Sequence, residues 1–443
     1  MKKIVGLFFG LTFCLGLNAQ EKSMRLSLEE AIQFAIENSY NTKASKNEVA
    51  AAKEVVWETT ATGLPQVNAS LDYKNYLKQA VSIADFNDDG INEEFVFGTK
   101  QNIYAVVSLS QLIFDGSYLV ALQATKAFLK ISKQVNEKTE LVTREAVVNA
   151  YGAVLVAEKS MTILEGNLSI LEKNLKDAKK IYQNGLNEEE DVEQLEITYG
   201  TLKNQLSNIQ RMKGISYQML NLTLGNAIDT TLILTDNLDA LAEQSSNLGM
   251  IAETFKVSNH IDFKMAENER ETKRLLVMLE KSKALPTLSA FLDYGSQAFS
   301  DSFTFFKRDQ LWFNSSLLGV SLKVPIFSSF GRKSKTAQAK IALETASFRV
   351  EETEQRLNLL AQKAKSEYQL SLENYTTAKR NVALSERIEN KQRIKFFEGI
   401  SSSFDLLIAQ NQLYTQQQNY VQSMMDVIAK KAALENALNV PIK

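Results

Sequence analysis

The sequence contains few of the residues on which enzyme sites and metal sites usually depend. Its 443 residues include a single histidine, His260, and a single cysteine, Cys14. This scarcity excludes a Cys/His zinc site and a Cys–His nucleophile pair, and it leaves a Ser–His–Asp triad to chance. The sequence also has no Walker phosphate loop and no glycine-rich dinucleotide turn. We therefore expect a protein that is not an enzyme and has no catalytic cofactor.

Proline and net charge are scarce as well. Only four prolines are present, although proline makes up about 5% of an average protein. Few prolines favour long uninterrupted elements, because proline breaks helices and the interior of sheets. Lys and Arg number 50 and Asp and Glu number 52, which leaves a formal net charge of −2. A nucleic-acid-binding protein normally shows a basic face, so no nucleic-acid partner is expected.

The N-terminal residues have the pattern of an export signal. Two lysines precede the apolar residues 4–17, a stretch too short to span a bilayer, and Ala19 is a small residue at the expected cleavage point. Residues 1–19 are therefore predicted to be a signal peptide. Cys14 follows a bulky phenylalanine, which favours an ordinary signal core over a lipid anchor. No later segment has eighteen consecutive apolar residues, so a membrane-embedded mature chain would have to form a closed β-barrel.

The sequence contains a long internal repeat. Residues 64–73 read LPQVNASLDY, and residues 285–294 read LPTLSAFLDY. We interpret the chain as a tandem duplication with a first structural repeat at 24–226 and a second at 248–443. A polar linker at residues 227–247 is expected between them.

Each repeat is expected to contain a helix, two strands, a long helix and a return helix. The strands alternate apolar and polar residues, which predicts one dry face and one wet face. A half-buried sheet of a soluble domain has the same alternation, so this pattern alone leaves both interpretations open. The expected bounds are a helix at 28–62, strands at about 66–78 and 101–114 and a long helix to about 184 in the first repeat, and a helix at 248–284, strands at about 286–298 and 311–326 and a long helix to about 398 in the second.

The long helices have the spacing of coiled coils. Between Gly331 and Gly399 there is neither glycine nor proline, and a continuous helix of that length would measure roughly 100 Å. Leucines before Gly185 and apolar residues after it recur at alternating steps of three and four, which predicts two antiparallel helices joined near this glycine. The seam residues include Leu164, Leu168, Leu171 and Leu175 before the turn, and Val192, Leu195, Tyr199 and Leu202 after it. The predicted fold class is mainly α with a membrane β-barrel.

Four strands per chain are too few to close a barrel, because closure needs about eight or more. Three chains would supply twelve strands, so the sequence predicts a homotrimer whose barrel contacts membrane lipid. Aromatic residues such as Tyr73 and Trp312 lie in or beside the strands, where a barrel places its interfacial aromatics. A single aromatic at such a position is more often a core residue, but the export signal and the repeat favour the membrane interpretation.

The order of elements and the two turns resemble the family of TolC-type outer-membrane efflux proteins. The turns read YQNGL, with Asp191 after it, and FFEGI, with Asp405 after it. The resemblance implies a homotrimer with a twelve-stranded barrel above a helical tunnel, located in the outer membrane of a Gram-negative bacterium with the helical part in the periplasm. It also implies a passive exit duct of a tripartite efflux or type I secretion system. The implied partners are a periplasmic adaptor and an inner-membrane pump.

The resemblance also locates the periplasmic entrance. The family's gate is closed by a Tyr and an Arg that bond to an Asp, and the Asp position is Asp191 here. The Tyr and Arg positions are Phe396 and Ser401, which cannot make these bonds, so the usual latch is absent. Asp405 matches one member of the family's acidic pair, whereas Ile408 does not match the other. The implied tip turns are Gly185, Leu186, Gly399 and Ile400.

Acidic residues follow the first turn directly. Glu188, Glu189 and Glu190 precede Asp191. Carboxylates are favourable at the positive end of a helix, and in a trimer they would also surround the mouth with negative charge that attracts cations. The two interpretations are compatible.

The segment between the first two strands contains a partial calcium-loop pattern. Asp85, Asn87 and Asp89 have the spacing of the first ligands of such a loop, but Val96 replaces the bidentate glutamate. A polar extracellular loop and a weak Ca²⁺ site therefore remain alternatives.

The competing hypothesis is a periplasmic coiled-coil adaptor or scaffold without its own pore. An adaptor would need a β-rich domain flanking one hairpin, whereas here two hairpins alternate with paired strands. This arrangement favours the exit duct.

Overall fold

The computed structural model describes residues 24–85, 90–185, 188–252 and 254–441. The predicted signal peptide lies outside the described residues. The chain divides into two compact units, which we call the helical unit (Met1–Lys43, Thr139–Phe255 and Leu360–Lys443) and the sheet unit (Ala44–Lys138 and Lys256–Leu359). Each unit therefore combines residues from both halves of the sequence.

The secondary structure is dominated by long helices. In chain order the elements are β1 (Met24–Leu26), α1 (Leu28–Asn38), α2 (Tyr40–Ala61), β2 (Gln66–Asn75), β3 (Val81–Ala84), β4 (Glu93–Val96), β5 (Gln101–Asp115), α3 (Gly116–Gln183), α4 (Glu189–Leu224), β6 (Leu232–Leu234), α5 (Leu238–Ser245), η1 (Leu248–Ala252), η2 (Val257–Asn259), α6 (Ile261–Ser282), β7 (Thr287–Ser300), β8 (Phe313–Lys323), α7 (Gly331–Phe397) and α8 (Ser403–Ala437).

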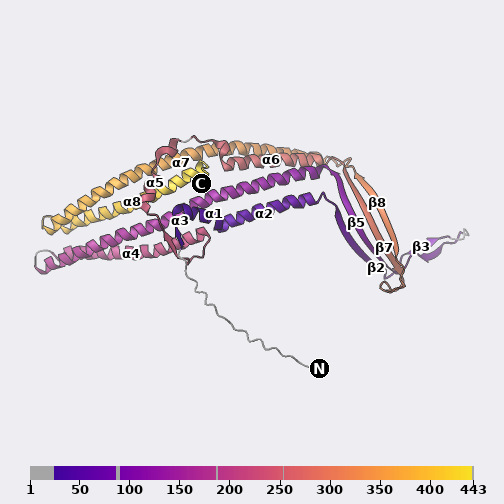
Figure 1. Cartoon of the computed structure of the whole chain (residues 1–443), viewed down its shortest axis with the longest axis horizontal. Helices are drawn as coiled ribbons and strands as arrows, with labels where there is room; N and C mark the ends of the chain where they lie inside the picture. Colours follow the sequence, from indigo (N-terminus) through magenta and orange to yellow (C-terminus); the bar gives the residue numbers. More distant parts are fainter. Residues whose placement is uncertain (1–23, 86–89, 186–187, 253, 442–443) are drawn as a thin grey trace, which may run out of the picture. The chain divides into compact units, whose positions relative to one another are not determined.

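The sheet unit contains one four-stranded antiparallel sheet in the order β2-β5-β7-β8 (Figure 1). Two strands come from each half of the sequence. Asn75 is the cross-strand partner of Gln101, and Gln101 is the partner of Ser300. The last residue of β2, the first residue of β5 and the last residue of β7 therefore lie at the same end of the sheet.

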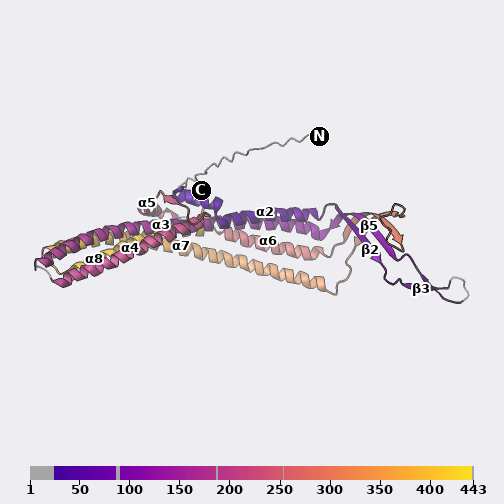
Figure 2. The ribbon, with the colours of Figure 1, turned by 90° about the horizontal axis from the view of Figure 1, so that it is seen from below.

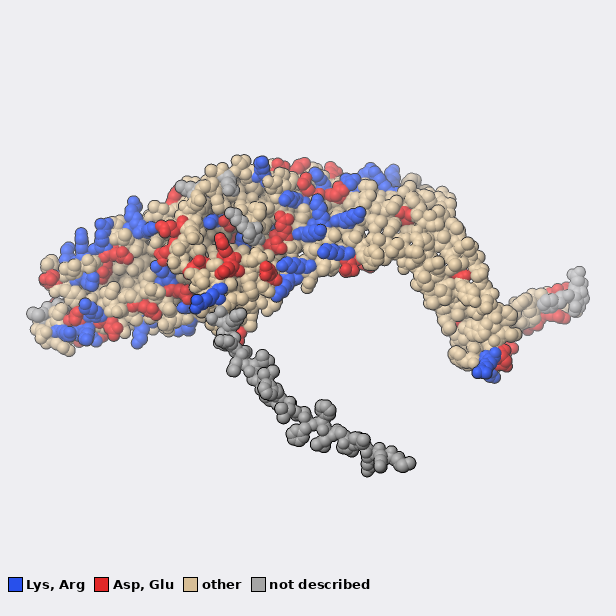
Figure 3. All heavy atoms as spheres, in the orientation of Figure 1, with Lys and Arg blue, Asp and Glu red and all other residues tan. Residues whose placement is uncertain are grey.

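The sheet has two chemically different faces. Cross-strand partners share a face, and successive residues of a strand point to opposite faces. An apolar row crosses all four strands: Val67, Leu109, Leu292 and Leu318. The adjacent row, on the opposite face, is mainly polar: Asn68, Ser108, Asp293 and Leu317. We call these the apolar face and the polar face, and few charged residues are visible on the sheet in Figure 3.

A second, small sheet lies between β2 and β5, where the sequence predicted only a loop. Strands β3 and β4 pair antiparallel, with Val81 opposite Val96 and Ala84 opposite Glu93. Each strand has only four residues, which is too short for a clear alternation pattern in the sequence.

The long helices form two antiparallel hairpins, α3 with α4 and α7 with α8 (Figure 2). Their turns lie in the helical unit, whereas the N-terminal parts of α3 and α7 belong to the sheet unit. The predicted seam between α3 and α4 is buried at Leu171, Ala178, Val192, Leu195 and Leu202. One window of α3 is long and apolar enough to cross a membrane by composition alone, with a mean hydropathy of 1.2, and 39% of it is buried. The described core of the helical unit includes Val147, Tyr151 and Val154 of this helix, so we interpret its apolar stripe as a packing surface.

The segment expected to be a linker is instead part of the helical unit. Within residues 227–247, β6 pairs in parallel with β1, and α5 buries Leu238 and Ala242. The Asp236 carboxylate accepts a hydrogen bond from the Leu28 N–H (2.7 Å) and another from the Tyr151 hydroxyl (3.0 Å). The linker prediction rested on the mainly polar composition of this segment. It did not take into account that a few of its leucines pack against residues elsewhere in the chain.

Two helices expected to be continuous are interrupted by capping residues. The helix expected at 28–62 breaks at Ser39, which has a ψ of 149° and whose hydroxyl accepts a hydrogen bond from the Thr42 N–H (3.3 Å). The helix expected at 248–284 begins as a regular α-helix only at Ile261, where Nδ1 of the buried His260 accepts from the Asp262 N–H (3.1 Å). Side chains that bond to the backbone compete locally with helix continuation.

Candidate functional site

The candidate site is the pair of turns that connect the helices of each hairpin in the helical unit. In the first turn, Gly185 has a φ of 71° and its N–H donates to the Tyr182 carbonyl at 2.8 Å. This left-handed conformation ends α3, and glycine adopts it without the cost that a Cβ would add. Leu186, predicted to belong to this turn, lies outside the described residues.

The second turn repeats this geometry. Gly399 has a φ of 70°, and its N–H donates to the Phe396 carbonyl at 3.1 Å. The Ile400 N–H donates to the Lys395 carbonyl at 2.8 Å, and the Ile400 side chain is exposed. The two glycines therefore end α3 and α7 in the same way.

Asp405 forms the N-terminal cap of α8 together with Ser402. The Asp405 N–H donates to the Ser402 hydroxyl (3.2 Å), and the Asp405 carboxylate accepts from that hydroxyl (2.9 Å) and from the Ser402 N–H (3.4 Å). Ser401 donates a further hydrogen bond to the same carboxylate oxygen (3.2 Å). These hydrogen bonds, first that from the Ser402 hydroxyl, lower the pKa of Asp405. Asp405 is thus an exposed anion that is held in place by its own turn.

The acidic residues predicted at the mouth lie at the start of α4. Glu188 occupies the N-cap position, and Glu189, Glu190 and Asp191 lie in the first turn. The three glutamates are exposed, and Asp191 is half-buried. Their placement favours interaction with the helix dipole, while the exposed carboxylates can also attract cations.

Phe396 and Ser401 make contacts within their own turn. Phe396 is 4% exposed, and its ring centroid lies 5.2 Å from that of Phe397. Ser401 donates to Asp405 and, at 3.4 Å, to the Gln392 side chain. Among the described residues, neither side chain has a hydrogen bond to Asp191. The second turn is therefore held by aromatic packing and serine hydrogen bonds.

Polar contacts join the two hairpins above the turns. The Ser403 hydroxyl on α8 donates to the Gln194 side-chain carbonyl on α4 at 3.1 Å. Further along, Asn167 of α3 donates to Gln417 of α8 at 2.8 Å. Tyr414 of α8 packs against the apolar seam between α3 and α4. The hairpins therefore meet through amide and hydroxyl groups around one tyrosine.

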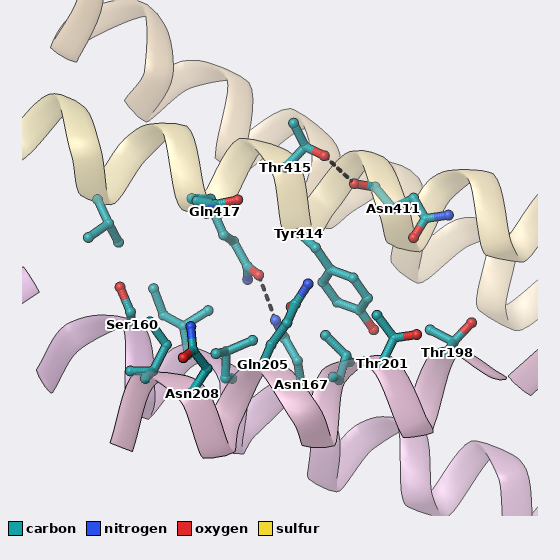
Figure 4. Close-up of a pocket in the computed structure, with 16 residues that line it drawn as sticks. Ser160, Asn167, Thr198, Thr201, Gln205, Asn208, Asn411, Tyr414, Thr415 and Gln417 are labelled. Atoms are coloured by element: carbon teal, nitrogen blue, oxygen red, sulfur yellow. Dashed lines mark hydrogen bonds between the residues drawn. The ribbon is translucent and has the colours of Figure 1, made fainter. Parts of the chain in front are cut away.

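A cavity of about 420 Å³ lies between α3, α4 and α8 (Figure 4). Its lining residues are uncharged, and most carry an amide or a hydroxyl, as do Asn167, Thr201, Gln205, Asn208 and Gln417. Sequence reasoning missed this cavity, although the glutamines at residues 416–418 were a visible signal. An uncharged polar lining offers hydrogen bonds without strong attraction for ions of either sign.

A buried carboxyl group also escaped sequence reasoning. Glu389 of α7 is 8% exposed and lies 3.6 Å from the Arg393 guanidinium. Burial raises the pKa of Glu389, opposed by the charge of Arg393 and a hydrogen bond with Gln410. The neighbouring Gln410 on α8 is buried as well, and its side-chain carbonyl oxygen has no hydrogen-bond partner among the residues that the structure describes. The α7–α8 interface therefore contains a polar cluster that is only partly satisfied.

The candidate calcium loop is described only in part. Asp85 accepts a hydrogen bond from the Gly90 N–H at 2.8 Å, and Asn87 and Asp89 lie outside the described residues. Within the described ranges, no group of three His, Cys, Asp or Glu side chains could hold a metal ion. Calcium binding stays a prediction.

The sheet and the paired long hairpins have the fold of outer-membrane channels. VceC from Vibrio cholerae aligns with a TM-score of 0.71 at 16% identity, covering 94% of this chain and 97% of that one. CusC aligns with a TM-score of 0.73 at 16% identity (96% and 95% covered), as does CmeC from Campylobacter jejuni (93% and 85% covered). No curated protein sequence matches the chain significantly.

The model of the family described as outer membrane efflux protein matches residues 31–226 and 257–440. The chain belongs to this family. It is an outer-membrane efflux channel of a Gram-negative bacterium, with its helical part in the periplasm. The resemblance to TolC-type proteins is therefore confirmed, and the channel is favoured over the adaptor or scaffold. The family consists of channels rather than enzymes, and its members work with adaptors and inner-membrane pumps.

Proposed function

We propose that three copies of the chain form a closed twelve-stranded barrel that continues into a helical tunnel. The observation that carries this proposal is the pair of edges of the four-stranded sheet. Within the described part of the chain, β2 and β8 each pair with a neighbour on one side only. Long open edges expose unpaired backbone groups, which a lipid environment does not tolerate.

The strand directions support closure. Each neighbouring pair in the sheet is antiparallel, so β2 and β8 also run in opposite directions. The β2 strand of one copy can therefore pair with β8 of the next copy in an antiparallel ladder. Three copies supply twelve strands, above the minimum of about eight for closure.

The two faces of the sheet support a membrane-embedded barrel with a water-filled interior. The apolar face exposes Val67, Leu318 and Leu322 in the single chain, and lipid would cover these side chains. The polar face presents Asn68, Ser108 and Asp293 to the lumen. This arrangement follows the alternation of membrane barrels, apolar outward and polar inward.

The hairpin turns form the periplasmic entrance in this proposal. Three-fold symmetry would bring the three copies of Asp405 around the pore axis, where closely spaced carboxylates bind cations. Asp191 and the adjacent glutamates add negative charge to the mouth. Because Phe396 and Ser401 replace the family's latch residues, packing around Phe396 and the hydrogen bonds of Ser401 would hold the resting entrance.

The duct itself is passive in this proposal. An inner-membrane pump delivers the substrate through a periplasmic adaptor and supplies the energy, as in the tripartite systems of the family.

The assembly is tested on isolated outer membranes. An unheated sample in mild detergent should give a gel band at three times the mass of one chain, and heating should convert it to a single-chain band. A monomer in mild detergent, or recovery of the protein from the soluble periplasmic fraction, would rule out the trimeric duct.

A further inference from the structure

The segment between β8 and α7 continues the apolar face of the sheet past the end of the last strand. Every second residue is apolar and exposed along β8 and beyond it: Leu318, Val320, Leu322, Val324 and Ile326. Strand β8 ends at Lys323, which pairs with Thr287 at the start of β7, and β7 follows α6. The segment therefore lies at the end of the sheet that the helices join.

Two phenylalanines of this segment are exposed and lie against each other. Phe327 is 74% exposed and Phe330 is 69% exposed, and their rings meet edge to face with centroids 5.9 Å apart. The Arg332 guanidinium donates to the Ile326 carbonyl at 3.2 Å, which ties the segment to the start of α7. The aromatic pair is thus held at the surface, beside a positive charge.

The backbone of the segment is strained at one of these aromatic residues. Ser329 has a φ of 48° and Phe330 a φ of 64°, a left-handed region that is costly for residues other than glycine. Burial within the chain does not offset this cost, because the Phe330 ring is mostly exposed. A strained residue with an exposed apolar side chain indicates a contact outside the chain.

Positive charge accompanies the aromatic rings. Between residues 310 and 343 there is no Asp or Glu, and there are five basic residues: Lys323, Arg332, Lys333, Lys335 and Lys340. Lys323, Lys333 and Lys335 are exposed. Figure 3 shows several Lys and Arg side chains on the helices that lead into the sheet, whereas the sheet has few. Positive charge without acidic neighbours in sequence attracts an anionic partner.

A membrane surface fits these features better than a neighbouring copy does. In a β2–β8 ladder the neighbour lies in the plane of the sheet, whereas the apolar face is directed out of that plane. The segment continues this face, which the proposed barrel turns toward lipid. At a membrane interface, aromatic rings lie at the level of the headgroups, and Lys and Arg side chains extend toward the phosphates. The segment and the start of α7 present both kinds of side chain in this order.

We propose that residues 324–335 form a binding site for an anionic phospholipid of the periplasmic leaflet, an inference that rests on the proposed barrel. Phe327 and Phe330 would insert between lipids at the headgroup level, and Arg332, Lys333 and Lys335 would bind the phosphate. The first half of the chain has no corresponding segment, because β5 passes directly into α3. Each copy therefore contributes one such site.

Fluorescence quenching in bilayers tests the lipid contact. The full chain with Phe330→Cys is labelled with a fluorophore and reconstituted in phosphatidylcholine containing a minor fraction of phosphatidylglycerol with a nitroxide on its headgroup. The control Phe348→Cys labels an exposed position on the same helix, about 26 Å beyond its start. We expect strong quenching at position 330 and little at position 348. Phe327→Cys is the second probe of the segment if Phe330→Cys lowers the yield of the trimer.

The preference for anionic lipid tests the basic residues. At equal mole fraction, quenching at position 330 by labelled phosphatidylglycerol should exceed that by labelled phosphatidylcholine several-fold. Lys333→Gln/Lys335→Gln should bring this ratio close to one. The control Arg349→Gln/Arg356→Gln removes the same charge further along α7 and should leave the ratio unchanged. Equal quenching by the two lipids without these substitutions, or an equal loss of preference in both pairs, would overturn the proposed site.

The unheated gel separates this inference from the proposed duct. A trimer in which the probes at positions 330 and 327 are not quenched overturns the lipid site, because protein then covers the segment, and it leaves the trimeric duct standing. Absence of any trimer in the unmodified protein overturns both proposals.

Discussion

Replacing Leu318 with arginine tests which face of the sheet contacts lipid. Leu318 is 75% exposed in the single chain and lies in the middle of the eleven residues of β8. Its cross-strand row is apolar, with Leu292 as its direct partner. An arginine on the lipid face of a barrel near the bilayer centre costs about 2–4 kcal/mol. Three copies would therefore destabilise the trimer by roughly 6–12 kcal/mol, with little compensation from new contacts.

The adjacent residue provides a matched control. Leu317 is also exposed, but it lies on the polar face with Asp293 as its direct partner. An arginine there would face the lumen and an opposite charge, and a change within about 0.5 kcal/mol is expected. The assay is the urea concentration at which the unheated trimer dissociates. Equal losses for Leu317→Arg and Leu318→Arg, or a larger loss for Leu317→Arg, would refute the assignment of the two faces.

Four further predictions concern the strands, the entrance and the helical unit. Cysteines at Val320 and Leu322 should resist a membrane-impermeant thiol reagent, whereas a cysteine at Ser321 should be labelled from the lumen; the opposite labelling pattern would reverse the sheet. Asp405→Asn should weaken cation selectivity and divalent-cation block in planar bilayers, and unchanged values would leave Asp405 with a capping role only. Because the pKa of Asp405 is lowered, its contribution to stability should be lost as the pH falls through that pKa. Because burial raises the pKa of Glu389, its folded form binds a proton more readily than its unfolded form, so acidification should relieve the cost of burying the charge. Glu389→Gln should therefore raise the midpoint temperature of thermal unfolding at neutral pH, and it should reduce the gain in stability on acidification. A lowered midpoint temperature would contradict this.

Long regular elements were the most readable part of the sequence. The absence of glycine and proline between Gly331 and Gly399 corresponds to helix α7, which spans Gly331–Phe397. Period-two alternation likewise marks residues 67–73, within β2. Both signals are local and repeat over many residues, so they do not depend on knowing the tertiary contacts.

Short elements with distant partners could not be read in this way. Strand β6 has three residues and gains its hydrogen bonds from β1, more than 200 positions earlier in the chain. Asp236 looked like an ordinary linker residue, yet it bonds to Tyr151 and Leu28. Such contacts depend on the assembled fold, and the sequence pattern contains no trace of them.

The candidate site was predictable in its turns but not in its packing. The repeated motifs marked Gly185 and Gly399, because a helix end in the left-handed conformation favours glycine. The spacing of Ser402 and Asp405 was also a readable capping signal. In contrast, the partners of Glu389 and the cavity between α3, α4 and α8 arise from helices that meet only after folding.

A cysteine scan along the two edges of the sheet tests whether neighbouring copies pair β2 with β8. One cysteine replaces Ser70 on the polar face of β2, and a second is moved along the polar face of β8 through Ser315, Leu317, Gly319 and Ser321. We expect covalent trimers in outer membranes from the cysteine pair that lies in register, and at most from its nearest alternative, since directly opposite residues lie within disulfide reach and more distant ones do not. Single-chain bands for every pair, in a protein that is correctly inserted in the membrane, would contradict it.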